Sequence, residues 1–386
     1  MKVPKTNTCV IILSCTVVFL SFLVAWPHVK KYVNLLVEEN IRLSRISETV
    51  EFEQSMIKIL HQPKVFTRRY ADFTANISGV FSGRVEKATY RLNQGERHDV
   101  LHLPPRVPWP LFTIELSPED LYPGENQLTL EVYGSETEKE AIPLRFTYDP
   151  SPITLPIRVD WSNTELDAHD GFWETINVDG TWHVRPKPGF EDYDRLLVVC
   201  GAFPGGRRIK TYLIYKYATG NGKPYGFGIL PLWGGRPDDV RPRRGWNFSL
   251  GWYYSHYHGI GMEFSYKHGD DDLKWVATYL GDYDVEAGTK YFVVIETWPE
   301  LDPKGSHLRY RQRMKWWAER EQEPPGWMDL ADTEGCPIPE GEYAIALNAH
   351  RSQVEFGPVL VEPLQSSSTK ATAFFTKGEP RSDAGE

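Results

Sequence analysis

The chain has 386 residues, enough for two or three domains, and its hydrophobic content of 41% is ordinary for a globular protein. The formal net charge of −9 argues against a nucleic-acid binder, whose domain is normally basic, so we expect no nucleic-acid partner. The sequence contains no glycine-rich phosphate loop and no zinc-type spacing of Cys and His. Aromatic residues are frequent at 13%, and 13 tryptophans stand out among them.

The N-terminus carries a long uncharged segment. Residues 9–26 are predominantly apolar and contain no charged residue, and a helix needs ~20 such residues to cross the hydrocarbon core. Trp26 suits a membrane interface, and Trp26 followed by Pro27 is a poor cleavage site for a signal peptidase. We therefore expect a cytoplasmic N-terminus (1–8), an uncleaved transmembrane signal-anchor (9–29) and a body outside the cytoplasm, which makes this a single-pass membrane protein. A cleaved signal peptide is the alternative.

A helical stalk is expected next, over residues 30–62. Apolar residues recur every seven positions at Leu36, Leu43, Val50 and Ile57. The companion positions of the heptad are half apolar; they are Glu39, Ile46, Glu53 and Leu60. Such a repeat is typical of a short coiled coil, which would make a homo-oligomer. A single amphipathic helix near the membrane is the alternative. Gln62-Pro63 ends the pattern.

Beyond the stalk the chain has no sustained helical period, and short runs rich in Val, Ile, Tyr, Phe and Trp alternate with turn residues. This predicts an all-β body. Residues 63–150 fit one small sandwich. The turns Tyr90–Gly95 and Leu121–Asn126 resemble those of bacterial Ig-like domains, which implies an Ig-like sandwich that acts as a spacer. Asp149-Pro150-Ser151-Pro152 then forms a stiff linker.

The main domain is expected over residues 151–365, followed by a disordered tail (366–386) rich in Ser, Thr and charge. At least nine segments with strand alternation and no helix fit a two-sheet jelly roll. They are Arg195–Val199, Lys210–Tyr217, Tyr225–Leu232, Gly261–Lys267, Trp275–Leu280, Tyr291–Trp298, Leu308–Trp317, Glu342–Leu347 and Gln353–Val361.

A family resemblance lies in the same region. Arg309–Trp317 followed by Glu323-Pro324-Pro325-Gly326-Trp327 is similar to a strand-and-turn pattern of concanavalin A-like (laminin G-like) sandwich domains. The closing stretches Pro339–Ala346 and Val354–Val359 resemble the last two strands of that superfamily, and Trp161, Trp173, Gly180 and Tyr193–Arg195 resemble the opening strands of bacterial proteins that join an Ig-like domain to it. The resemblance implies a concanavalin A-like jelly-roll sandwich, as in lectins and glucanases, but a fold does not determine an activity.

Strand alternation assigns side chains to faces. In 309–317 the even positions (Tyr310, Gln312, Met314, Trp316) fit a core, and the odd positions (Arg309, Arg311, Arg313, Lys315, Trp317) carry the cations. If the strands of Glu263, Glu296 and Arg311 are neighbours, we expect a charged groove on the concave sheet. The alternative is a solvated face with cross-strand pairs, each worth ~0.2–1 kcal/mol.

Residues 231–260 are expected to form a long loop, dense in arginine and aromatic side chains that recognise polyhydroxylated ligands. The candidate ligand-binding residues are Trp233, Arg236, Arg243, Arg244, Trp246, Trp252, Tyr254, His256 and His258, together with Arg311 and Arg313. The alternative is a loop that packs on the sandwich with arginine stacked over tryptophan.

Metal and cysteine chemistry are weakly indicated. His256 and His258 could bind zinc with His268 or His350, and Gly269–Asp272 could hold Ca2+, but a hydrogen-bonded loop and an acidic turn are the alternatives, so no metal site is assigned. Cys200 and Cys336 could form a disulfide or remain buried thiols. The triplets Asn76–Ser78 and Asn247–Ser249 have the pattern of glycosylation acceptors, in keeping with export.

Three functions follow from these patterns. The first is binding of, or adhesion to, a glycan through the jelly roll. The second is a polysaccharide-cleaving enzyme with Glu263 and Glu296 as its carboxylates, since retaining glycosidases hold two carboxyl groups about 5–5.5 Å apart. The only glucanase-like stretch, Glu296-Thr297-Trp298-Pro299-Glu300, lacks the middle aspartate, which argues against hydrolysis. The third is a structural or assembly role.

Overall fold

The computed structural model describes residues 55–70, 73–100, 102–103, 111–135, 138–162, 165–191, 193–219, 223–236, 245–256, 259–267, 276–301, 308–329, 338 and 341–364. The chain divides into two compact units, 1–56 and 57–386, and every strand belongs to the second. Within the described ranges there is one 3-10 turn, Pro118–Asp120, and no helix long and apolar enough to span a bilayer. The predicted signal-anchor and tail lie outside these ranges, as does the stalk up to residue 54.

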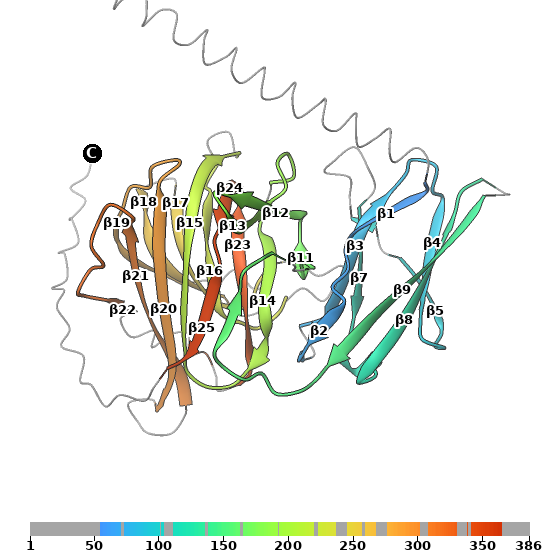
Figure 1. Ribbon diagram of the computed structural model, residues 1–386, viewed down its shortest axis with the longest axis horizontal. Coiled ribbons are helices and arrows are strands. Elements are labelled where there is room, and N and C mark those ends of the chain that lie inside the picture. The colour runs from blue at the N-terminus through green and yellow to red at the C-terminus, as the bar shows by residue number, and fades with distance from the viewer. Residues whose placement is uncertain are drawn as a thin grey trace, which may run out of the picture. The chain divides into compact units, whose positions relative to one another are not determined.

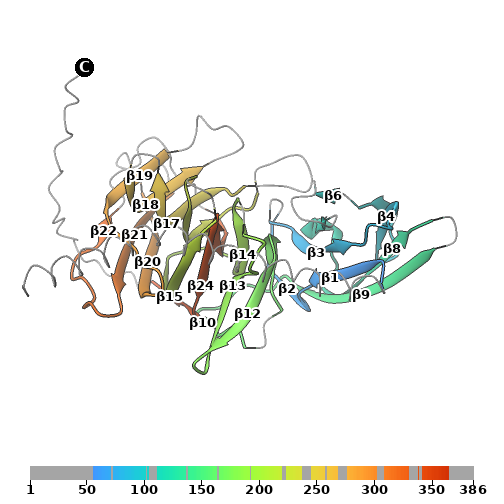
Figure 2. The same cartoon turned by 90° about the horizontal axis from the view of Figure 1, so that it is seen from above.

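A small two-sheet sandwich occupies residues 57–149. One sheet has the order β1-β3-β7-β6 and the other β2-β9-β8-β4-β5. Figure 2 shows this part of the chain from above. In β8 the alternate residues Leu128, Leu130 and Val132 are buried, which is the two-residue period of a strand with one face on a core. The strands are β1 (Ile57–His61), β2 (Val65–Thr67), β3 (Ala75–Phe81), β4 (Lys87–Leu92), β5 (Arg97–Asp99), β6 (His102–Leu103), β7 (Leu111–Leu116), β8 (Gly124–Tyr133) and β9 (Lys139–Asp149). The Ig-like assignment of this sandwich stays a prediction.

The expected end of the stalk is wrong. Residues Ile57–His61 form strand β1, which pairs antiparallel with β3 through Ile57–Phe81 and Lys58–Val80. The last apolar heptad position, Ile57, is buried, because the chain joins the sheet there. A heptad with half of its companion positions charged offers less burial than pairing with β3 does.

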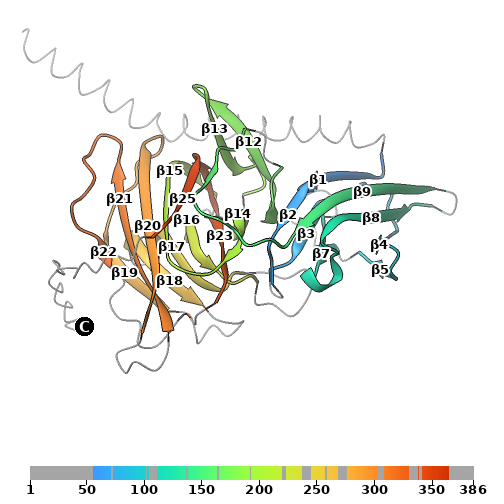
Figure 3. The same ribbon diagram turned by 60° about the horizontal axis from the view of Figure 1, so that its bottom comes forward.

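The second domain consists of two larger curled sheets, as expected of a jelly-roll sandwich (Figures 1 and 3). One has the order β12-β13-β24-β15-β20-β21-β22, with β25 between β15 and β10, and the other β11-β14-β23-β16-β17-β18-β19. We call these the nine-stranded and seven-stranded sheets. The strands are β10 (Ile157–Val159), β11 (Ala168–Asp170), β12 (Trp173–Val178), β13 (Thr181–Pro186), β14 (Arg195–Phe203), β15 (Arg207–Ala218), β16 (Gly226–Trp233), β17 (Phe248–His256), β18 (Gly259–Lys267), β19 (Val276–Asp282), β20 (Lys290–Leu301), β21 (Leu308–Ala318), β22 (Met328–Asp329), β23 (Tyr343–His350), β24 (Ser352–Phe356) and β25 (Val359–Pro363).

One core lies between these two sheets. It takes Ile209, Ile295 and Trp316 from the nine-stranded sheet, and Phe227 and Leu347 from the seven-stranded sheet. The expected faces of strand 309–317 are confirmed, because the even positions are buried and Arg311, Arg313 and Trp317 of the odd set are half-buried. Lys315 is more buried than the other odd residues.

The expected loop over residues 231–260 is wrong in its second half. Phe248–His256 forms β17, a central strand paired with β16 on one side and β18 on the other. The expected strand 353–361 is instead two strands, β24 and β25, which are separated by Gly357-Pro358. Proline lacks the N–H that a continuous ladder requires at that point.

Two expectations about export chemistry also change. Asn76 is fully buried in β3 and Asn247 is 6% exposed, so neither triplet presents an exposed glycosylation acceptor in the folded chain. Cys200 is a free thiol in the core, and burial raises its pKa to about 12. The disulfide alternative is therefore not formed, and Cys336 lies outside the described residues.

Candidate functional site

The two candidate carboxylates do not form a pair. Glu263 lies on β18 of the seven-stranded sheet and Glu296 on β20 of the nine-stranded sheet. Their strand neighbours Phe264 and Ile295 both enter the shared core, so each glutamate points away from that core on its own sheet. The expected charged groove, which needed both strands in one sheet, is therefore wrong, and so is the pairing of these two residues in one hydrolytic site.

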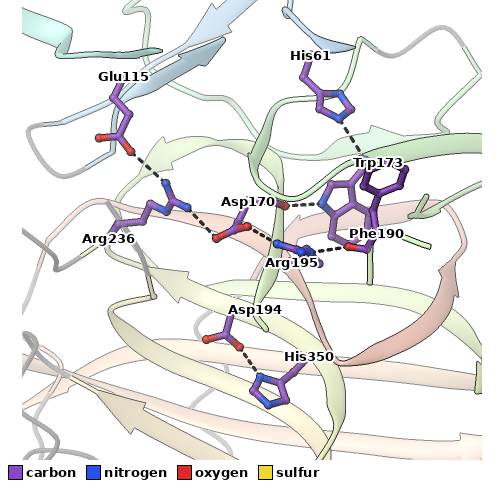
Figure 4. A network of polar contacts seen from close by, with 9 residues as sticks. All are labelled: His61, Glu115, Asp170, Trp173, Phe190, Asp194, Arg195, Arg236 and His350. Carbon is purple, nitrogen blue, oxygen red and sulfur yellow. Dashed lines mark hydrogen bonds and ion pairs between the residues drawn. The ribbon is translucent and has the colours of Figure 1, made fainter. Parts of the chain in front are cut away.

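Several predicted ligand residues are buried in the protein instead. Arg236 is 4% exposed and donates to Glu115 Oε1 (3.0 Å) and Asp170 Oδ2 (3.1 Å), as Figure 4 shows. Trp233 is fully buried and contacts His169 edge-on, with ring centroids 4.8 Å apart. Trp246 is 5% exposed in the same apolar cluster. These side chains join the small sandwich to the large one.

The remaining predicted residues fall into three groups. Arg243, Arg244 and His258 lie outside the described residues, and of His256 only the backbone, in β17, is described. Arg311 and Arg313 lie on the outward face of the nine-stranded sheet. Trp252 and Tyr254 lie on the outward face of the seven-stranded sheet. Polar residues of β18 and β23 lie on the same face.

Strand register builds this second face. Gly228 on β16 pairs with Asn348 on β23 and with Trp252 on β17, and Trp252 pairs with Glu263 on β18. One step along, Gly226 pairs with His350 and Tyr254. Directly paired residues of an antiparallel sheet share a face, so these side chains form two adjacent rows. We call them, with Asp194, Ser265 and Arg351, the sheet-face cluster.

Glycine on β16 is what brings the rows together. A Cβ on Gly226 would lie 2.8 Å from both Trp252 Cε3 and Tyr254 Cδ2, so a side chain there cannot coexist with the two rings. The rings stack on each other with centroids 4.2 Å apart and an interplanar angle of 14°. They lean over β16 and reach His350 of β23, whose ring lies 5.9 Å from that of Tyr254.

Glu263 is anchored beneath the stacked rings. Its Oε1 accepts hydrogen bonds from Trp252 Nε1 (2.7 Å) and Ser265 Oγ (2.6 Å), and the side chain is almost fully buried. Burial first, and then the carboxylate of Glu263, raise the pKa of Tyr254 to about 12. The Tyr254 hydroxyl therefore stays protonated at neutral pH and can act as a donor.

The two ring nitrogens of His350 have different partners. Its Nδ1 lies 2.7 Å from Asp194 Oδ1 and its Nε2 lies 2.8 Å from Arg351 Nη1 (Figure 4 shows the Asp194 contact). A guanidinium can only donate, so Nε2 is the acceptor toward Arg351 and Nδ1 is the donor toward Asp194. This arrangement is that of an oriented acid–base or hydrogen-bonding group.

Backbone strain marks the same place. Asp194 and Arg351 both have left-handed backbones, with φ of 46° and 48°. This region is uncommon for non-glycine residues, and such strain costs of order 1–3 kcal/mol, which proteins mostly retain at functional sites. Here it places the Asp194 carboxylate and the Arg351 guanidinium on the two nitrogens of one imidazole.

The side chains of the sheet-face cluster are buried at Asn348, and exposure to solvent increases toward Tyr254 and Tyr193. Asn348 is fully buried, and neither of its amide atoms has a hydrogen-bond partner among the described residues. Tyr254 is half-buried, and Tyr193 is 48% exposed with its ring 4.6 Å from that of His350. An unpaired buried amide costs about 1–3 kcal/mol, so Asn348 is a group that a ligand could satisfy.

Asp194, His350, Asn348 and Tyr193 were not among the predicted ligand-binding residues, and His350 was considered only as a zinc ligand. The signals for them are slight: Asn348 and His350 share a face at the end of one strand, and Tyr193-Asp194 lies in a segment that enters the family resemblance only. For metals, no group of three or more His, Cys, Asp or Glu side chains in the described part of the chain could hold an ion. His268 and Asp270–Asp272 lie outside that part, so zinc and Ca2+ remain untested there.

The chain matches no protein-family model, and no curated protein matches it. Among solved structures it is similar to the carbohydrate-binding module CBM66 from Bacillus subtilis (14% identity, 51% of this chain and 94% of that chain covered, TM-score 0.30) and to the Lotus tetragonolobus seed lectin (8% identity, 54% and 97% covered, TM-score 0.33). It is also similar to the Ca2+- and mannose-bound exoplasmic/lumenal domain of VIP36 (12% identity, 53% and 91% covered, TM-score 0.35). At these TM-scores the similarity identifies neither a family nor a ligand.

Proposed function

We propose that the protein binds a glycan at the sheet-face cluster. The observation that carries this proposal is the pairing, on one sheet face, of the stacked Trp252–Tyr254 rings with an anchored carboxylate and an unpartnered buried amide. A sugar has apolar C–H faces that pack on aromatic rings, and its hydroxyl groups need both donors and acceptors. The cluster offers both kinds of contact within two adjacent rows.

The charges of the cluster favour an uncharged polyhydroxylated ligand. The carboxylates of Glu263 and Asp194 accept hydrogen bonds, the Tyr254 hydroxyl and the Arg351 guanidinium can donate them, and the Asn348 amide can do both. Two carboxylates and one guanidinium leave the cluster with a net negative charge, which opposes an anionic ligand. A neutral sugar satisfies the amide without adding a buried charge.

We also propose that the body is presented outside the cytoplasm on a single-pass anchor, with the stalk setting the oligomeric state. The support is the uncharged run 9–26 and the heptad repeat that follows it. Carbonate-resistant membrane association that is lost on deletion of residues 1–29 tests the anchor. Release of the intact chain by carbonate would contradict it.

A glycan array with the purified ectodomain, followed by titration of the best neutral ligand, tests the binding proposal. Tyr254→Ala and Asn348→Ala should each weaken binding at least tenfold, because one removes a stacking ring and the other the unpartnered amide. Tyr122→Ala, which removes a 65% exposed tyrosine of the small sandwich, is the matched control. Binding unchanged in both cluster variants, with melting temperatures also unchanged, would reject the site. Release of reducing ends that disappears in Glu263→Gln would instead identify an enzyme.

A further inference from the structure

The outward face of the nine-stranded sheet carries an unusual set of tryptophans. Trp298 on β20, Trp317 on β21 and Trp327 just before β22 are half-buried, whereas Trp161, Trp173, Trp233, Trp246, Trp252 and Trp316 are buried. Trp182, also half-buried, packs against the core. Register separates two of them along β21, because Trp298 pairs with Arg311 near one end of that strand and Trp317 pairs with Phe292 near the other.

Cations lie between these tryptophans. The guanidinium carbon of Arg313 lies 5.2 Å from the ring centroid of Trp298 and 4.3 Å from that of Trp327. Lys315 Nζ lies 4.8 Å from the Trp327 ring on the next outward position of β21. From Arg311 to Trp317 the strand advances about 20 Å at its usual rise per residue. We call this row of Trp298, Arg311, Arg313, Lys315, Trp317 and Trp327 the outer strip.

The carboxylates of this face do not neutralise the cations fully. Glu296 has no exposed side chain, and it bonds two guanidiniums, those of Arg208 and Arg313, with Arg313 Nε at 2.6 Å. Arg311 pairs with Glu300 and Lys315 with Glu323. In these ion pairs the four cations, Arg208, Arg311, Arg313 and Lys315, outnumber the three carboxylates, Glu296, Glu300 and Glu323. The Arg208 and Arg313 side chains are 39% and 22% exposed above the buried Glu296 carboxylate.

We propose that the outer strip is a second binding site, which takes an acidic polysaccharide lying along β21. The tryptophan rings would pack on sugar faces, and the guanidiniums would bind the carboxylate or sulfate groups in the bidentate geometry that arginine provides. Successive anionic sugars match the three cations at successive outward positions of β21, Arg311, Arg313 and Lys315, which have the Trp298 and Trp327 rings beside them. A protein partner is less suited, because binding hot spots need a desolvated apolar pocket, whereas here a cation lies beside the rings of Trp298 and Trp327.

The outer strip and the sheet-face cluster are on opposite sides of the sandwich core. Their charges differ in sign, so we expect them to bind different polymers, one acidic and one neutral. The outer strip depends on none of the residues of the sheet-face cluster, and its proposal stands or falls separately. If both sites function, one molecule can link two kinds of polysaccharide chain, and a surface displaying many copies gains avidity without new contacts.

Affinity electrophoresis of the full chain in detergent tests this inference, with polygalacturonate or dextran cast in the gel. We expect retardation by polygalacturonate alone, weakened at least fivefold by Trp298→Ala combined with Trp327→Ala, and similarly by Arg311→Ala. Raising the salt concentration should also reduce it, because the contacts are partly ionic. Tyr254→Ala should leave it unchanged. Arg145→Ala, at a 71% exposed arginine of the small sandwich, is the matched control.

Three results would overturn the inference. One is full retardation of the tryptophan double variant when its melting temperature equals that of the parent. A second is equal retardation by dextran, which would show that the cations do not select the ligand. The third is equal capture by double-stranded DNA or by phosphatidylserine vesicles at the same charge concentration, which would show a general polyanion surface.

Discussion

His61 is a buried imidazole that must stay neutral. Its Nε2 accepts a hydrogen bond from the backbone N–H of Trp173 at 3.1 Å (Figure 4), and burial lowers its pKa from 6.5 to about 4. In the unfolded chain the same ring titrates near 6.5, so the unfolded state binds the proton first as the pH falls. The free energy of unfolding therefore decreases below pH 6.5, and His61 alone accounts for about 2 kcal/mol between pH 7 and pH 5.

His61→Gln isolates the contribution of His61 to the pH dependence of stability. The Gln side-chain oxygen can accept the hydrogen bond from the Trp173 N–H, and the Gln side chain does not titrate. The variant should lose about 2 kcal/mol less stability than the parent between pH 7 and pH 5, measured by urea unfolding at both pH values. The parent's total loss includes other groups: burial also lowers the pKa of His169, and it raises that of Asp167, which acts in the opposite sense. The contributions of His169 and Asp167 cancel when the stability loss of the variant is subtracted from that of the parent. Equal pH dependence in the two proteins would show that His61 is not the titrating group.

Among the strands, β16 contains a glycine, Gly228, that its close contact with the neighbouring strand β17 explains. A Cβ on Gly228 would overlap the backbone of Gly251 and the Cβ of Trp252, and neither can move without disturbing β17. Gly228→Ala should therefore destabilise the fold by about 1–3 kcal/mol, the usual cost of overpacking, and should weaken glycan binding because Trp252 is displaced. Urea unfolding and ligand titration of the same preparation measure the two effects. Gly180→Ala, at an open turn with a positive φ, is the control, which should lose stability from backbone strain but keep its affinity.

Strands differ in how far the sequence predicts them. β21 is predictable, because Tyr310, Gln312, Met314 and Trp316 alternate with cations and only one face is apolar. β17 is not, because Leu250 and Trp252 are buried on one face and Tyr253 on the other, so no two-residue period is visible. The candidate site could not be predicted from the sequence either. Trp252 and Tyr254 are evident as a dense aromatic run, but Asp194 and His350 are 156 residues apart and become neighbours only through strand register.

At the scale of the whole molecule, the small sandwich is bound to the large one by buried charges, which does not fit a simple spacer. Arg236 forms ion pairs with Glu115 of β7 and Asp170 of β11. Arg69, in the segment that follows β2, forms an ion pair with Asp167 of the large sandwich. Arg68 adds a half-exposed bridge to Glu342 at 2.7 Å. Trp233, on the strand that leads to Arg236, packs in the same apolar cluster as Trp252. The two sandwiches should therefore unfold together.

Glu115→Ala tests this coupling most directly. The Glu115 and Arg236 side chains are nearly fully buried, so removing the glutamate leaves a buried guanidinium with only the partly exposed Asp170 as its counter-charge. Loss of one partner of a buried ion pair typically costs about 3–5 kcal/mol. We expect Glu115→Ala to lower the temperature of a single calorimetric transition of the unit 57–386, with both sandwiches affected although the mutated residue belongs to the small one. Glu125→Ala, which breaks the exposed pair with Arg145, should cost no more than about 1 kcal/mol. Two separate transitions in the parent, with only one shifted by Glu115→Ala, would mean that the sandwiches fold independently, and the small one would again be a spacer.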